Sequence, residues 1–161
     1  MPIDAPTQPT VIIKPATTPA PSVRGLHPIR LRPSLAGHFH MSGMIGGKPV
    51  EILIDTGASA TVVDRSWAEA NGFTLKQLER QGAGVGGATV ALAMLEENRL
   101  TLDGLQITTP LVAIDLSNVK AGLARLNVAP PQVVLGVDVL RSRRAVIDYA
   151  TSTLWLAPAP R

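Results

Sequence analysis

From Phe39 onward, the apolar residues come in short runs separated by glycine, proline and aspartate. Short apolar runs that are bounded by turn-forming residues are typical of β-strands. Two such runs flank Gly46-Gly47-Lys48-Pro49, and a glycine-containing connection of this length indicates a hairpin. We therefore expect a mainly β domain with one or two short helices.

Proline is concentrated near the N-terminus, where eight of the 14 prolines lie within the first 35 residues. This Pro-, Thr- and Ala-rich stretch has the composition of an extended linker that forms no packed core. We expect a flexible arm or linker over residues 1–36, a folded domain over residues 37–157 and a C-terminal tail over residues 158–161. A domain of about 120 residues buries roughly two-thirds of its unfolded surface, enough for one small core. A domain of this size is too small for a large two-lobed enzyme.

The composition argues against several classes of protein. No cysteine is present, so the chain has no disulfide, no zinc-thiolate site and no thiol nucleophile. The net charge is only +3 and the chain has five aromatic residues, so nucleic-acid binding is disfavoured. No apolar run approaches the roughly 20 residues that span a bilayer. We expect a cytoplasmic protein as the chain stands, or a periplasmic or membrane-tethered one if an anchor once preceded the arm.

Local patterns predict the individual elements. Expected strands cover residues 39–45, 50–54, 89–95, 99–102, 105–108, 111–114, 145–149 and 153–156. A short helix is expected over 64–72, with Ser66 and Glu69 at capping-box spacing and a stop at Asn71-Gly72. Residues 74–80 suggest a helical turn. The pattern over residues 117–126 does not decide between a helix and a connecting loop. A second short helix is expected over 138–143, with Asp138 as its N-cap residue.

Asp55 directly follows an apolar strand and precedes Thr56 and Gly57. An ionised carboxylate at the end of a buried strand needs hydrogen-bond donors or a charge partner. Gly57 lets the backbone turn sharply, so that its amide can point back at the carboxylate. The alternative is a structural Asx-type turn, in which Asp55 caps its own backbone.

Two separated motifs give the chain a family resemblance. The first is the apolar-apolar-Asp-Thr-Gly-Ala run at residues 53–58, and the second is Val134-Leu135-Gly136 before the expected short helix. Together they make the sequence similar to the retropepsin-like aspartic proteases of the bacterial branch, over roughly residues 37–156. The resemblance implies a closed β-barrel lobe, with Gly136 beside the Asp55 loop. It also implies an aspartic endopeptidase that acts on peptides or proteins without a metal or cofactor.

Such proteases use two carboxylates that share a proton and bind one water. Of the seven aspartates in the chain, only Asp55 is followed by Thr-Gly, so the resemblance implies a two-fold homodimer with one Asp55 from each copy. Within the motif, the resemblance implies that Asp55 is the catalytic carboxylate, that Thr56 bonds to the partner's loop and that Gly57 offers its amide to the carboxylate. Ala58 shapes the loop and contacts substrate. A catalytically silent dimerisation or peptide-binding module on the same fold is the alternative.

The glycine-rich segment at residues 82–88 lies where the family places its flap, a hairpin that closes over bound peptide. We expect Gly84, Val85, Gly86 and Gly87 to contact bound peptide. With Gly82, the same segment also matches the G-x-G-x-x-G fingerprint of dinucleotide-binding proteins. A true fingerprint follows a buried strand and opens a helix, and the preceding residues are polar, so this alternative is disfavoured.

Some residues invite two interpretations. His38 and His40 alternate across Phe39 and could share a metal, but the chain has no convincing set of further ligands, so surface or paired histidines are favoured. Trp67 and Trp155 are expected in the core or at an interface. The strand at 153–156 is a candidate dimer contact.

Overall fold

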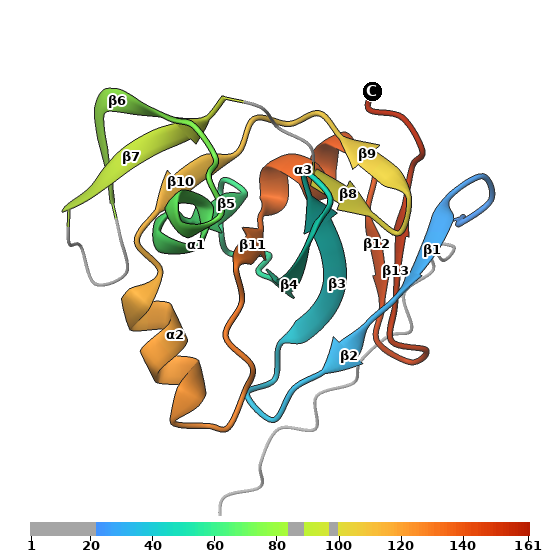
Figure 1. Ribbon diagram of the computed structural model, residues 1–161. Coiled ribbons are helices and arrows are strands. Elements are labelled where there is room, and N and C mark those ends of the chain that lie inside the picture. The colour runs from blue at the N-terminus through green and yellow to red at the C-terminus, as the bar shows by residue number, and fades with distance from the viewer. Residues whose placement is uncertain (1–21, 84–88, 97–99) are drawn as a thin grey trace, which may run out of the picture.

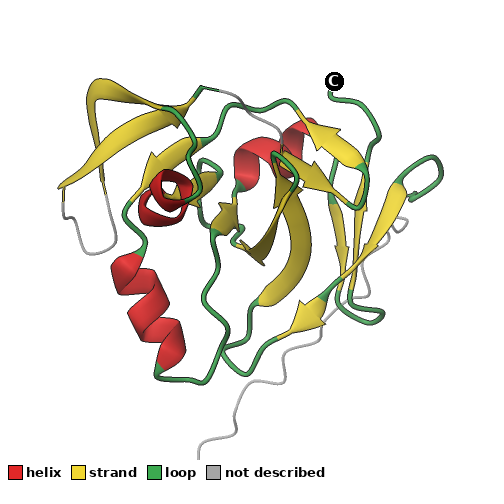
Figure 2. Ribbon diagram, viewed as in Figure 1, coloured by secondary structure: helices red, strands yellow, loops and turns green. Residues whose placement is uncertain are grey.

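The structure is a computed structural model that describes residues 22–83, 89–96 and 100–161. Strands dominate these residues, as the yellow ribbons of Figure 2 show. The strands are β1 (His27–Arg30), β2 (Arg32–Pro33), β3 (Phe39–Ile45), β4 (Lys48–Ile54), β5 (Val62–Asp64), β6 (Leu75–Ala83), β7 (Thr89–Leu95), β8 (Leu100–Leu102), β9 (Leu105–Ile107), β10 (Val112–Ile114), β11 (Val133–Leu135), β12 (Val146–Asp148) and β13 (Thr153–Leu156). The helices are α1 (Arg65–Ala70), α2 (Ser117–Ala124) and α3 (Val137–Ser142).

Ten strands form one curled sheet around the core. Its order is β6-β7-β10-β5-β11-β4-β3-β8-β9, with β2 paired to β3. A second sheet has the order β1-β13-β12 and lies at the opposite side of the molecule from α2 (Figure 1). Fully buried side chains such as Ile45, Ile52, Leu135 and Leu154 fill the space inside. The expected mainly β lobe with few short helices is confirmed.

The chain joins the fold earlier than we expected. β1 pairs with β13 and β2 pairs with β3, although both strands lie within the expected 1–36 linker. Ile29 and Leu31 are only 4% and 3% exposed, so they belong to the core. Pro28 is tolerated because β1 is an edge strand, where a missing N–H breaks no ladder. The boundary at residue 36 is therefore wrong, and the expectation of a flexible arm now concerns residues 1–21, outside the described residues.

Helix α1 confirms the expected helix but not its cap. The helix begins at Arg65, after Asp64 as N-cap residue, and the Ser66 hydroxyl donates to the Asp64 carboxylate at 2.8 Å. Ser66 is thus inside the helix, and the expected capping box is wrong. Gly72 adopts a φ of +78° after the helix, which confirms the expected stop at Asn71-Gly72.

The expected helical turn at 74–80 is wrong, because residues 75–80 belong to strand β6. β6 pairs antiparallel with β7, with a register shift between Gln77 and Gln81. The ambiguous segment at 117–126 contains α2. Within the described residues, no helix has both the length and the apolar character required to cross a membrane.

Candidate active site

The site is built where a loop crosses the end of a strand. β11 lies between β4 and β5, parallel to β4 and antiparallel to β5. The loop 55–61 connects β4 to β5, so it must pass over the C-terminal end of β11. The Asp55 amide donates to the Leu135 carbonyl at 3.0 Å, and the Val137 amide donates to the Ala58 carbonyl at 2.8 Å. The two motifs found in the sequence therefore meet in space.

The Asp55 carboxylate lies at the start of this loop and is partly exposed. The Gly57 amide donates to its Oδ1 at 2.8 Å, and the Ala58 amide donates to the Asp55 carbonyl at 3.2 Å. These bonds form an Asx-type turn, the local geometry named by the structural alternative, and they also place the Gly57 amide against the carboxylate as we expected. No other described residue bonds to the carboxylate, so its remaining lone pairs are available to water or a ligand. Thr56 and Gly57 are exposed beside it.

Gly136 lies directly beneath the loop. A Cβ at this position would come within 2.6 Å of the Ala60 carbonyl oxygen and 2.9 Å of the Ala58 carbonyl oxygen. Real Cβ atoms do not approach backbone oxygens this closely, so only glycine fits. This contact agrees with the position that the resemblance implied for Gly136.

Thr61 and Asp138 form a link that sequence reasoning missed. The Asp138 carboxylate accepts from the Thr61 amide at 2.9 Å and from the Thr61 hydroxyl at 2.7 Å. The Thr61 hydroxyl in turn accepts from the Gly136 amide at 3.0 Å. Gly136 is the N-cap residue of α3 and makes no side-chain cap bond, so our assignment of Asp138 as N-cap is wrong. Asp138 instead fastens the end of the Asp55 loop to α3.

Comparison with known proteins gives the family. Residues 41–139 match the aspartyl protease family, and this range includes both motifs and the Thr61–Asp138 link. The chain belongs to the aspartyl protease family.

Solved structures show the same fold. The retroviral protease-like domain of Ddi1 from Leishmania major matches with a TM-score of 0.52 and 17% identity, covering 73% of this chain and 86% of that one. A retropepsin-like aspartic protease from Rickettsia conorii matches with a TM-score of 0.50 and 20% identity, covering 81% of this chain and 90% of that one. The single-lobe retropepsin-like fold of this aspartyl protease is thus confirmed.

The segment that we expect to form the flap lies between β6 and β7, which pair as antiparallel strands. Gly84, Val85, Gly86 and Gly87 lie outside the described residues, so their predicted contact with peptide stays a prediction. The glycine-rich segment joins two antiparallel strands, and it is followed by β7. A dinucleotide fingerprint opens a helix, so this arrangement contradicts the nucleotide-binding alternative.

Ala58 belongs to an apolar cluster on the outer face of β4 and β11. Leu53 and Val134 from these strands pack with Leu116, the N-cap residue of α2, and with Leu123 in the helix. Ala58 packs against this cluster. A buried apolar cluster of the aspartyl protease therefore holds α2 against β4 and β11, and Ala58, three residues after Asp55, packs against it.

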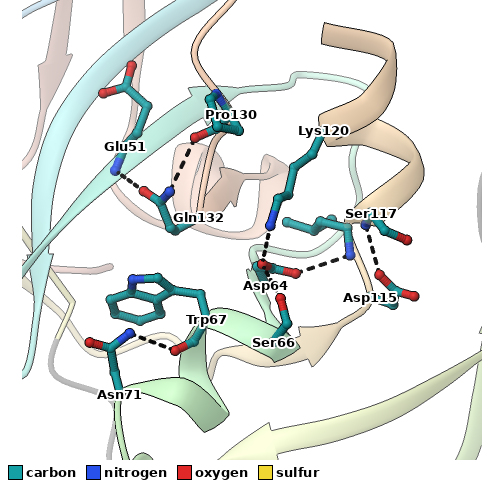
Figure 3. Close-up of polar contacts among 11 residues, drawn as sticks. Glu51, Asp64, Ser66, Trp67, Asn71, Asp115, Ser117, Lys120, Pro130 and Gln132 are labelled. Atoms are coloured by element: carbon teal, nitrogen blue, oxygen red, sulfur yellow. Dashed lines mark hydrogen bonds and ion pairs between the residues drawn. The ribbon is translucent and has the colours of Figure 1, made fainter. Parts of the chain in front are cut away.

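An ion pair fastens α2 to the sheet (Figure 3). Lys120 Nζ lies 2.8 Å from Asp64 Oδ2, and the Leu116 amide donates to Asp64 Oδ1 at 3.3 Å. Asp64 is only 1% exposed. Burial raises the pKa of Asp64, but hydrogen bonds from Lys120, Ser66 and Leu116 outweigh burial and hold this pKa below its ordinary value.

The histidines do not share a ligand. His38 is exposed before β3, whereas His40 is buried and its Nδ1 lies 3.1 Å from Glu51 Oε1. The Glu51 amide donates to Gln132 Oε1 at 2.7 Å, which ties β4 to the segment before β11 (Figure 3). In the part of the chain that the structure describes, no three His, Asp or Glu side chains group as metal ligands.

Proposed function

We propose that this protein is an aspartic endopeptidase whose active site combines two Asp55 carboxylates, one from each subunit of a homodimer. The observation that carries the proposal is the partly exposed Asp55 carboxylate, held by the Gly57 amide in a family motif that Gly136 supports. In such a pair, one ionised carboxylate takes a proton from the attacking water. The other, protonated, donates a hydrogen bond to the scissile carbonyl.

Two other aspartates of the domain, one partly exposed and one buried, are already engaged. Asp138 accepts two hydrogen bonds from Thr61, and Asp64 is paired with Lys120. Neither belongs to a turn like that of Asp55. A partner subunit is therefore the natural source of the second carboxylate. We assign Thr56 to the contact with the partner's loop, and Ala58 together with the 84–87 segment to substrate binding.

We had named the strand at 153–156, which is β13, as a candidate dimer contact, and its place inside the second sheet argues against pairing of β13 with a partner strand. β13 is paired on both sides, by β1 and by β12, so its backbone offers no free edge. The edge strands of this three-stranded sheet are β1 and β12. β1 contains Pro28, which lacks an N–H, while β12 carries no proline. Val146 of β12 is half-buried and lies beside Trp155, also half-buried. We assign the dimer contact to the β12 edge.

The test is replacement of Asp55 by Asn, assayed on a mixed peptide pool by mass spectrometry. We expect Asp55→Asn to remove cleavage, because an amide cannot serve as the base. The control Asp103→Asn changes an exposed aspartate in the turn between β8 and β9 and should cleave as the wild type does. Wild-type cleavage should follow a bell-shaped pH profile, since the pair works only when it holds one proton. Unchanged cleavage by Asp55→Asn would refute the proposal.

A further inference from the structure

Three polar side chains from adjacent strands meet where the chain enters the ten-stranded sheet. Arg32 of β2 lies 2.7 Å from Glu51 Oε2, and Nδ1 of His40 in β3 lies 3.1 Å from Glu51 Oε1. Glu51 of β4 thus engages one neighbour with each of its carboxylate oxygens. None of the three residues belongs to the proposed catalytic loop.

Strand β2 depends on these side chains because its backbone offers little. The strand consists of Arg32 and Pro33 alone, and proline has no N–H to donate to β3. The Arg32 guanidinium, which also donates to the Ser42 hydroxyl at 3.4 Å, supplies ties to β3 and β4 that so short a strand lacks. Leu31 is buried in the core directly before β2, so any detachment would be confined to the residues after it.

His40 is held in this cluster as a neutral ring. Its side chain is buried, and Nδ1 faces a carboxylate, which can only accept, so the ring proton lies on Nδ1. The buried Nε2 has no hydrogen-bond partner among the described residues, and the buried Ser34 hydroxyl has none there either, so these two groups do not bond to each other. Burial lowers the pKa of His40, Glu51 opposes this effect in part, and Arg32 and His38 lower the pKa further.

A proton added to His40 would disfavour the closed cluster in two ways. It would place an N–H at the buried Nε2, which has no acceptor among the described residues. It would also create a second cation directly opposite Arg32, because Arg32 and His40 are paired residues of the β2–β3 ladder. The single negative charge of Glu51 cannot neutralise both cations. Movement of β2 away from β3 would separate the two cations and open Nε2 to water.

We propose that the Arg32–Glu51–His40 cluster is an acid-sensitive latch, which holds β2 on the sheet while His40 is neutral and releases β2 when His40 is protonated. The turn at residues 34–37 continues directly from β2 and should open with it. The charged and titratable groups that face His40 are Glu51 from β4, Arg32 from β2 and His38 from the segment before β3. The latch does not depend on proteolysis.

Protonation and opening are linked thermodynamically. The closed latch disfavours the proton, whereas a hydrated His40 in the open state takes it up near the ordinary pKa of 6.5. Opening is therefore rare above pH 6.5 and becomes more frequent as the pH falls below this value. Each further pH unit raises the open population by about tenfold at most, until the closed form is protonated as well.

Hydrogen exchange in the full chain measures this opening. The reporter is the Ser34 amide, which donates to the His38 carbonyl at 2.8 Å. Its protection factor, the exchange rate of an unstructured peptide divided by the rate measured by NMR, should fall about fivefold to tenfold between pH 7.5 and pH 5.5. The Gly136 amide, which donates to the Thr61 hydroxyl at 3.0 Å, is the internal reference and should keep its protection factor.

A constant protection factor at Ser34 would overturn the latch. A parallel fall at Ser34 and Gly136 would also overturn it, because the whole domain would then be opening.

A pair of variants shows whether His40 is the group that responds to acid. Asparagine in His40→Asn offers an N–H to Glu51 but gains no charge, so the Ser34 protection factor should no longer depend on pH. His38→Gln removes an exposed histidine two residues away and should retain the wild-type fall. If His40→Asn retains this fall as well, another group drives the opening and the latch is refuted.

The His40 ring gives a readout that needs no substitution. Nitrogen NMR spectra of the wild type at pH 7.5 should show the ring proton on Nδ1, and the titration midpoint of His40 should lie below 6.5. A midpoint at or above 6.5 would mean that the closed cluster does not disfavour the proton. That result would overturn the latch even if His40→Asn fails to fold.

Discussion

At Gly136, two backbone carbonyl groups occupy the space that a side chain would need. The Ala60 and Ala58 oxygens lie 2.6 and 2.9 Å from the position of a Cβ. These atoms belong to the crossing loop that begins at Asp55, so relief of a clash would have to move that loop. The residue thus couples the packing of the fold to the geometry of the proposed active site.

We expect Gly136→Ala to destabilise the domain by roughly 1–3 kcal/mol, the usual cost of overpacking, and to reduce peptide cleavage. Urea unfolding measures the first effect. Gly122→Ala is the matched control, because Gly122 lies in α2 with no atom within 4 Å of its Cβ position. Alanine there should stabilise by about 0.5–1 kcal/mol. Equal stability of the two variants would contradict the close approach at Gly136.

Residue-level prediction of local geometry succeeded where the residue types were distinctive: the Gly57 amide bonds to the Asp55 carboxylate, and Gly136 lies against the Asp55 loop. Asp55, Gly57 and Gly136 stand in short motifs whose chemistry can be read locally. The Thr61–Asp138 link could not be read in this way, because its partners are 77 positions apart and each has an ordinary local role. A threonine before a strand and an aspartate near a helix start do not indicate one another.

At the scale of elements, α2 is held to the sheet by a buried carboxylate. The folded-state pKa of Asp64 lies below the ordinary value of 3.8, so the unfolded chain binds its proton more readily. Its contribution to stability is therefore present above about pH 4 and is lost as the pH falls through the lower folded-state pKa.

We expect Asp64→Asn to lower the free energy of unfolding at pH 7 and to reduce its decline in acid. Urea unfolding between pH 7 and pH 3 tests this. Glu69→Gln, on the exposed face of α1, is the control and should retain the wild-type decline. An Asp64→Asn variant with the full wild-type decline would show that another carboxylate causes it.

Strand prediction was best where pairing is local and regular. The β3–β4 and β12–β13 hairpins were predicted, because alternation and turn residues are adjacent in the sequence. β6 was misread as helical because its register shifts between Gln77 and Gln81, which breaks the two-residue alternation of a regular strand. The insertion of β11 between β4 and β5 is non-local, and no segment of the sequence reveals it.

At the scale of the whole molecule, the proposed active site requires two copies of the chain, which we expect to join at the β12 edge. The side chain of Val146 shares a sheet face with Trp155, and both are half-buried in the single chain. A charge at Val146 would have to be desolvated when a partner covers this face.

We expect Val146→Asp to raise the dimer dissociation constant at least tenfold, as measured by sedimentation. Cleavage should fall at low protein concentration and recover at high concentration. Thr108→Asp adds the same charge at an exposed residue next to the ten-stranded sheet and should dimerise normally. Normal dimerisation of Val146→Asp would place the contact elsewhere.

Mixing of subunits tests the central claim most directly. Wild-type and Asp55→Asn chains are combined in equal amounts, allowed to exchange, and assayed at constant total protein on one peptide. If each site needs both Asp55 carboxylates, random pairing leaves about one quarter of the dimers active, so the rate falls to about a quarter of the wild-type rate. A fall to only about half, in proportion to the wild-type chains present, would show that each chain works alone and would contradict the shared active site.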